Sequence, residues 1–299
     1  LPDELHPDIY MADRALEWLD AWDGRAPLYL HLGFLSPHDL YDPPQRFLDL
    51  YDDDDIPMPQ VTAEERAGIP DELFAQHRRL EAAHGATVIK PSRATPERIR
   101  RMRKHYYASV TMIDEKIGQL VDKLKEKGLY DAAVVIFTSD HGDHLFDHDL
   151  IYKGELYDTI VRVPLMVKAP GVTPQFRRED LVSHMDVVQY ILDMAGADGE
   201  GLHGVSLRTA VEEGSEHPNR YVFAEEVPGP GLVSWSPPSP CRTGEGSGSV
   251  ESSAGRNRPG SEPAGHKEGQ QSLCQVVHSS SIGRFARTSS AITGGGGAG

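Results

Sequence analysis

Residues 132–144 of the chain, AAVVIFTSDHGDH, decide the expected fold. The first six form an unbroken apolar, largely β-branched run, which is typical of a short strand buried on both faces in a parallel sheet covered by helices. Asp140 and His141 follow at the carboxyl end of that strand. Ligands of open α/β sheets bind outside the carboxyl ends of the strands, so we expect the functional site here.

The residue types at this strand end suit a divalent cation and an anion. The carboxylate of Asp140 and the imidazole of His141 are both metal ligands, and Lys153, twelve positions after His141, can hold an anionic substrate. An Asp-His pair in a loop is more often a turn or a cap than a metal site. The strand before the pair and Lys153-Gly154 after it favour the functional interpretation.

Residues 138–171, TSDHGDHLFDHDLIYKGELYDTIVRVPLMVKAPG, resemble the signature of the sulfatase family. This family includes arylsulfatases and phosphonate monoester hydrolases and lies within the alkaline-phosphatase-like superfamily. The resemblance implies that Asp140 and His141 are ligands of the catalytic metal and that Lys153 contacts the sulfate. It also implies an α/β sandwich with a central, mostly parallel sheet flanked by helices. Phe146 departs from the pattern because many members carry glycine there, so we expect an altered loop shape.

A second segment of the resemblance lies upstream at residues 28–38, LYLHLGFLSPH. Its apolar residues predict a strand that ends before Pro37-His38. From the residues alone, His38 is more readily structural than catalytic, and His31 is interpreted as a core histidine. The segment resembles the part of sulfatases in which a strand ends in Pro-His and the histidine lies on the leaving-group side of the ester. The resemblance therefore implies that His38 is a general acid, a role that suits a side chain titrating near neutrality.

The nucleophile is not part of this sequence. The sulfatase resemblance implies a formylglycine made from the Cys or Ser of a C/S-x-P-x-R motif, and an N-terminal Asp-Asp pair that completes the metal site. Residues 1–227 contain no cysteine, and no such motif occurs in the chain. We therefore expect a fragment whose upstream segment, with the formylglycine, is missing. The expected ion is Ca²⁺, with Mn²⁺ or Zn²⁺ as alternatives because His141 is a softer ligand.

Three functions remain open from the sequence. The first is a metal-dependent hydrolase of sulfate esters, acting on a sulfated small molecule or glycan, of which this chain carries only part of the active site. The second is a phosphodiesterase or phosphonate monoester hydrolase of the same superfamily. The third is a truncated gene product that keeps the fold without turnover.

Composition limits the binding partners and the cellular location that we expect for the protein. The 299 residues carry a formal net charge of −16, so nucleic acid is not an expected partner. No apolar run approaches the roughly 18 residues that span a membrane. Residues 1–4, LPDE, have neither an initiator methionine nor the features of a signal peptide, so the visible sequence favours the cytoplasm. The sequence leaves the oligomeric state open.

The chain is expected to divide near residue 228. Residues 1–227 are predicted to form a partial sulfatase catalytic domain. Residues 228–299 are rich in Gly, Ser and Pro and lack apolar periodicity, so we predict a disordered tail. The abrupt change favours a frame shift in the gene over a natural tail, with loss of the C-terminal subdomain that the family carries.

Within the predicted domain, capping residues and apolar runs predict the positions of two helices and two strands. Thr95 predicts the N-cap of a long amphipathic helix that Gly128 ends. Asp186 predicts the N-cap of a second helix. Two further apolar runs, residues 163–168 and 220–226, are expected strands.

Overall fold

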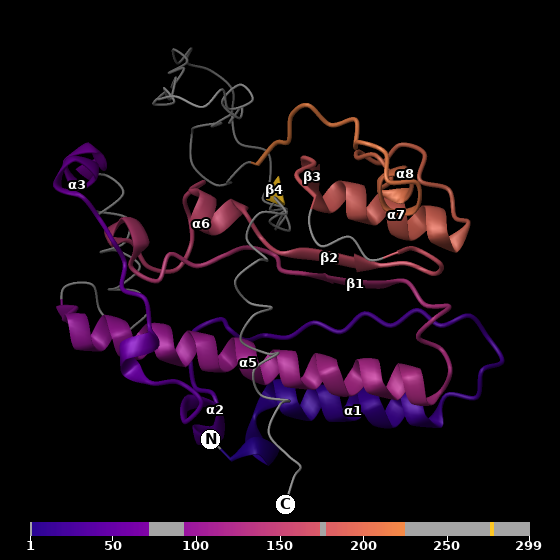
Figure 1. Ribbon diagram of the computed structural model, residues 1–299, viewed down its shortest axis with the longest axis horizontal. Helices are drawn as coiled ribbons and strands as arrows, with labels where there is room; N and C mark the ends of the chain where they lie inside the picture. The colour runs from indigo at the N-terminus through magenta and orange to yellow at the C-terminus, as the bar shows by residue number, and fades with distance from the viewer. Residues whose placement is uncertain (1, 72–92, 174–177, 225–275, 278–299) are drawn as a thin grey trace, which may run out of the picture. The chain divides into compact units, whose positions relative to one another are not determined.

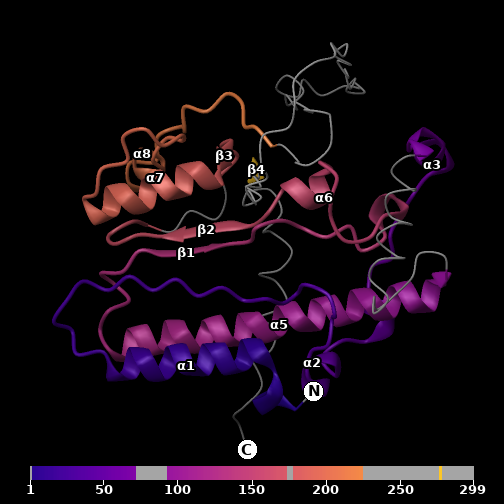
Figure 2. The same ribbon diagram turned by 180° about the vertical axis from the view of Figure 1, so that it is seen from behind.

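The structure is a computed structural model, shown from two sides in Figures 1 and 2, in which two compact units are distinguished. It describes residues 2–71, 93–173, 178–224 and 276–277. The predicted tail at residues 228–299 therefore lies outside the described residues, except for the backbone of Val276–Val277.

The first unit, here called the helical unit, comprises Leu1–Ala133 and Asp143–Tyr152. The second, the sheet unit, comprises Val134–Gly142 and Lys153–Gly299. Within the described residues, no helix is both long and apolar enough to cross a membrane.

Helices α1 (Pro7–Ala21) and α5 (Pro96–Glu126) lie side by side in the helical unit, as both views show (Figures 1 and 2). Each begins with proline, whose fixed φ and missing N–H suit the first helical position. The Thr95 side chain accepts from the amide of Arg98, so the predicted N-cap of the long helix is confirmed. The helix ends just before Gly128, which has a φ of +67°.

Two salt bridges cross the contact between α1 and α5. The Lys116 Nζ lies 2.9 Å from the Asp13 Oδ1, and the Lys123 Nζ lies 3.3 Å from the Asp20 Oδ1. The pairs follow each other in the same order along both helices, so the helices run in parallel. Lys116 is only 7% exposed, so Asp13 neutralises a buried charge, whereas the outer pair is largely solvated and contributes little.

Short helices complete the helical unit and bury apolar side chains against α5. Phe47 of α2 packs with Ile9 and Met112, and Tyr41 packs with Met102. The short elements are η1 (Asp3–Leu5), α2 (Gln45–Leu48), η2 (Asp53–Asp55), α3 (Ala63–Gly68) and η4 (Asp147–Asp149).

The strand expected before Pro37 is absent from the structure. Residues 28–35 form no ladder with any strand in the described parts of the chain. The side chains of Tyr29 and Leu35 are exposed, and so is His31, so its interpretation as a core histidine was wrong. An apolar run needs a paired strand to become part of a sheet, and local sequence does not supply one.

In the sheet unit, β1 (Val135–Thr138) pairs with β2 (Leu165–Lys168). The ladder is antiparallel and joins Val135 to Lys168 and Thr138 to Leu165. The side chains of β1 are half-buried, not buried on both faces as expected. The apolar run thus predicted a strand correctly, but the ladder that it forms in the described residues is antiparallel and not parallel as expected.

Helix α7 (His184–Ala195) packs on the β1–β2 ladder (Figure 1). Val187 and Tyr190 of α7 are buried against side chains of both strands, including Ile136 and Val167. The remaining elements of this unit are α6 (Asp158–Val161), β3 (Val182–Ser183), α8 (Arg208–Glu212) and β4 (Val276–Val277), which pairs with β3.

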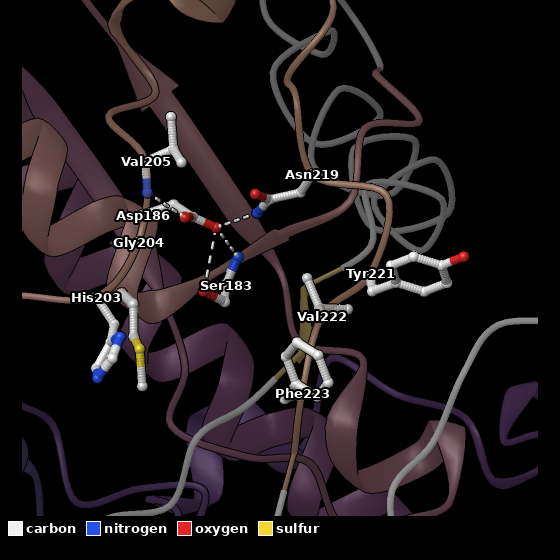
Figure 3. Close-up of a pocket in the computed structure, with 10 residues that line it drawn as sticks. Ser183, Asp186, His203, Gly204, Val205, Asn219, Tyr221, Val222 and Phe223 are labelled. Atoms are coloured by element: carbon white, nitrogen blue, oxygen red, sulfur yellow. Dashed lines mark hydrogen bonds between the residues drawn. The ribbon is translucent and has the colours of Figure 1, made fainter.

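The start of α7 corrects the predicted cap. Ser183 is the N-cap, and Asp186, at the third helical position, is its capping-box partner. The helix begins earlier than expected because β3 ends at Ser183 and the chain turns directly into the helix. The buried Asp186 carboxylate also accepts from Val205 N at 2.7 Å and Asn219 Nδ2 at 2.9 Å (Figure 3).

The second expected strand near the end of the domain does not form within residues 220–224, and residues 225–226 lie outside the described residues. Tyr221 and Phe223 are 60% and 69% exposed, whereas the alternate residues Val222 and Ala224 are buried. This alternation is that of an extended chain with one buried face. The strand prediction was therefore wrong for residues 220–224, where the chain is extended but forms no ladder.

Candidate active site

The carboxyl end of β1 forms a tight turn that presents Asp140. The Ser139 hydroxyl donates to the carbonyl of His141 at 2.9 Å, and the His141 amide donates to the Asp140 Oδ1 at 2.9 Å. The side chain of Asp140 is nevertheless 83% exposed. The turn thus orients a carboxylate that is still open to a ligand.

Gly142 brings this turn against α6. Its amide donates to the carbonyl of Ile160 at 2.8 Å, and a Cβ at this position would lie 1.9 Å from the carbonyl oxygen of Thr159. No side chain fits in that space. Glycine is therefore required here for close backbone approach.

The tautomer of His141 follows from its contacts. The Nδ1 lies 2.7 Å from the carbonyl oxygen of Gly142, and because a carbonyl can only accept, the Nδ1 carries the hydrogen. In the neutral ring the Nε2 therefore carries the accepting lone pair. This nitrogen lies 2.5 Å from the Lys153 Nζ. The Asp140 Oδ2 lies 3.5 Å from the same nitrogen. The structure thus brings Asp140, His141 and Lys153 together in the sheet unit.

A second histidine, which the sequence did not indicate, lies behind this turn. The Nε2 of His184 lies 3.2 Å from the Oγ1 of Thr138, and the ring also hydrogen-bonds the backbone of Ser139. Burial lowers the pKa of His184, although the hydrogen bond to Ser139 and the charge of Asp140 act in the opposite direction. No capping or periodicity signal could have shown a contact between segments this far apart in sequence.

The predicted acid, His38, belongs to the helical unit. Its Nδ1 lies 2.7 Å from the Oδ1 of Asp39, which orients the ring, and its side chain is partly exposed. The buried Asp8 of α1 holds the preceding backbone, because its two carboxylate oxygens accept from the amides of Leu35 at 2.7 Å and Ser36 at 2.9 Å. Neither carboxylate was anticipated from the sequence.

The loop Asp143–Tyr152, between His141 and Lys153 in the sequence, is closed by a buried carboxylate of the helical unit. The Asp143 Oδ1 accepts from the amides of Leu145 at 3.0 Å and Tyr152 at 3.1 Å, and its Oδ2 accepts from the Tyr41 hydroxyl at 2.7 Å. Burial raises the pKa of Asp143. The first and last residues of the loop are thereby held together.

Phe146, the position that departs from the sulfatase pattern, has a φ of +70°. This is the left-handed region that glycine enters readily and that costs other residues about 1–2 kcal/mol. The Phe146 side chain is buried with Tyr41, Met102 and Ile151, which contributes about 2–3 kcal/mol and offsets the strain. The altered loop shape expected from this departure stays a prediction.

The donor set fits a divalent ion in part. Asp140 supplies a carboxylate and His141 an imidazole lone pair, both suitable ligands. In the residues that the structure describes, no three His, Cys, Asp or Glu side chains are grouped so as to hold a metal ion. Further ligands would therefore have to come from outside this group.

The family model named Sulfatase matches residues 4–197. The chain is 28% identical over 228 residues to the arylsulfatase of Clostridium perfringens, covering 75% of this chain and 45% of that protein. It is 34% identical over 190 residues to the choline-sulfatase of Rhizobium meliloti, covering 62% and 35%. The chain therefore spans less than half the length of these curated relatives.

Solved structures agree on the fold. The phosphonate monoester hydrolase of Silicibacter pomeroyi matches with a TM-score of 0.66 and 26% identity, covering 75% of this chain and 44% of that one. The expected α/β fold of the alkaline-phosphatase-like type is thereby confirmed.

Proposed function

Because this chain belongs to the sulfatase family, we propose that it carries one side of the active site of a metal-dependent sulfate-ester hydrolase. The observation that carries the proposal is the strand end of the sheet unit, where Asp140, the His141 lone pair and the Lys153 ammonium converge. A cation-binding pair beside a cationic side chain suits an anionic ester.

Asp140 and His141 would hold the divalent ion that the family uses. The Nδ1–H of His141 donates to a backbone carbonyl, which is how metal-ligating histidines are commonly oriented. We propose Ca²⁺, with Mn²⁺ or Zn²⁺ as alternatives, and an Asp-Asp pair outside this chain as the remaining ligands. A divalent ion bound there would stabilise negative charge on the sulfate oxygens.

Lys153 would contact the sulfate. Its ammonium group donates to the His141 Nε2, and that lone pair serves one partner at a time. When His141 ligates an ion, Lys153 must leave it, and its ammonium group is then available to an oxyanion. The same contact thus keeps Lys153 near the place where the sulfate would bind.

His38 would protonate the leaving group. Its Nδ1 is engaged by Asp39, which leaves the Nε2 to donate a proton to the ester oxygen as the sulfur–oxygen bond breaks. The nucleophile would be a formylglycine hydrate, and the chain holds no C/S-x-P-x-R motif from which to make one.

The metal assignment is tested by calorimetric titration of the chain with Ca²⁺ and Mn²⁺. Asp140→Ala should weaken binding by about 10-fold or more, because it removes one of only two ligands here. Asp198→Ala, a matched change at an exposed aspartate of the same unit, should leave the affinity unchanged. Equal affinities for wild type and Asp140→Ala would refute the assignment.

The hydrolase assignment is tested by turnover of an aryl sulfate. Residues 1–299 alone should show none, since no residue here can become the aldehyde hydrate. A protein extended upstream to include the motif, made with the formylglycine-generating machinery, should be active. In that protein Lys153→Ala and His38→Ala should each lower kcat/KM by about 10²-fold or more. Metal-independent turnover by residues 1–299 would overturn the proposal.

A phosphodiesterase or phosphonate monoester hydrolase is the second candidate. The TM-score of 0.66 to a phosphonate monoester hydrolase is compatible with it. The same extended protein, assayed with an aryl sulfate and an aryl phosphonate monoester, distinguishes the two by the ratio of kcat/KM values. A ratio in favour of the sulfate supports the first proposal.

A further inference from the structure

His184, the first residue of α7, contacts the carboxyl end of β1. Its ring contacts the Thr138 hydroxyl at 3.2 Å and the backbone of Ser139, the two residues directly before Asp140. The segments are 46 residues apart in the sequence, so this contact depends on tertiary structure.

The first turn of α7 is itself firmly held. The Asp186 carboxylate accepts from the amide of Ser183 at 2.6 Å and its hydroxyl at 3.1 Å, in addition to Val205 and Asn219 (Figure 3). On the other side Gly204 approaches so closely that a Cβ there would lie 2.6 Å from the carbonyl group of Met185. His184 therefore projects from an anchored backbone.

The turn at the end of β1 has few other constraints. Asp140 hydrogen-bonds mainly within its own turn, and its side chain is largely exposed. Gly142 holds the far end of the turn through the Ile160 carbonyl. The near end, at Thr138 and Ser139, is held by the last pair of the β1–β2 ladder and by the His184 ring.

We propose that His184 is a positioning residue for the metal-binding turn: it fixes Thr138 and Ser139 so that Asp140 and His141 point to a common ligand. The nature of that ligand, a divalent ion, rests on the proposed function. The positioning of the turn rests only on the contacts of His184 and can be measured without a metal.

The first experiment follows hydrogen exchange of the metal-free chain by mass spectrometry. His184→Ala should accelerate exchange in residues 139–142 by about 10-fold, because one end of the turn is released. His184→Gln, whose amide can reach the same groups, should restore most of the protection. The control is His203→Ala, at an exposed histidine of the same unit, and it should change nothing in this segment. Wild-type exchange in His184→Ala would overturn the proposal.

The second experiment measures Mn²⁺ affinity of the same variants. Removing a group that orients metal ligands typically costs 10–100-fold in affinity, so His184→Ala should bind Mn²⁺ about 10-fold more weakly, with recovery in His184→Gln. Wild-type affinity in His184→Ala, while Asp140→Ala loses binding, would refute the positioning role. If Asp140→Ala also keeps full affinity, the metal assignment fails, and the exchange data still decide on His184.

Discussion

The two long helices of the helical unit and the strand-end region of the sheet unit are held by different groups. In the helical unit, α1 and α5 start at local caps and meet through apolar side chains and ion pairs. In the sheet unit, the start of α7 and the end of β1 depend on a buried carboxylate and on a glycine in close backbone contact. Loss of the Asp186 carboxylate or of Gly142 should therefore cost more stability than loss of a solvated ion pair or of a local cap in the helical unit.

The largest effect is expected from Asp186→Ala. This change leaves donors of Ser183, Val205 and Asn219 without their acceptor, and we expect the free energy of unfolding to fall by about 3 kcal/mol. Urea denaturation measures it. In the helical unit, Asp20→Ala removes one solvated partner of Lys123 and should lower the free energy of unfolding far less. Equal losses would remove the contrast between the units.

Gly142→Ala and Gly118→Ala should have opposite signs. The first places a Cβ against the Thr159 carbonyl and should cost about 2–3 kcal/mol. The second places a Cβ in open space on α5 and should stabilise by up to about 1 kcal/mol, the difference in helix propensity. Thermal unfolding of both variants is the measurement. A neutral Gly142→Ala would show that the turn can move away from α6.

A cap in the helical unit should matter less than the carboxylate in the sheet unit. Thr95→Ala removes the acceptor of the Arg98 amide at the start of α5, at a cost of about 1 kcal/mol. Thr95→Ser keeps the hydroxyl and serves as the control. A loss as large as that of Asp186→Ala would contradict this ranking of cap and buried carboxylate.

The smallest effect concerns pH. Burial lowers the pKa of His105, whose ring hydrogen-bonds the Tyr41 carbonyl. Between the ordinary histidine pKa of about 6.5 and the lower folded value, the unfolded chain binds the proton first, so stability falls as the pH drops. His105→Gln should flatten this dependence between about pH 7 and pH 5 in urea titrations. Equal slopes for wild type and His105→Gln would contradict the prediction.

Local chemistry explains which parts could be predicted. Thr95 and Gly128 bounded α5 correctly because caps act within one turn. Asp140, His141 and Lys153 were placed together from a signature whose residues are close in sequence, and they do meet. His31 and the cap of α7 were misjudged because exposure and the start of a helix after β3 depend on neighbours distant in the chain.

By itself, the sequence determined the family, the strand before Asp140 and the chemical types at its end, since these depend on residue identity and short spacings. Tertiary structure alone decided which other groups hold the backbone beside the candidate site residues. His184 reaches Thr138, and Asp8 holds the backbone before His38, across long separations in sequence. The physical reason is that hydrogen bonds between distant segments require the packed fold, and single-residue preferences carry no information about which segments will meet.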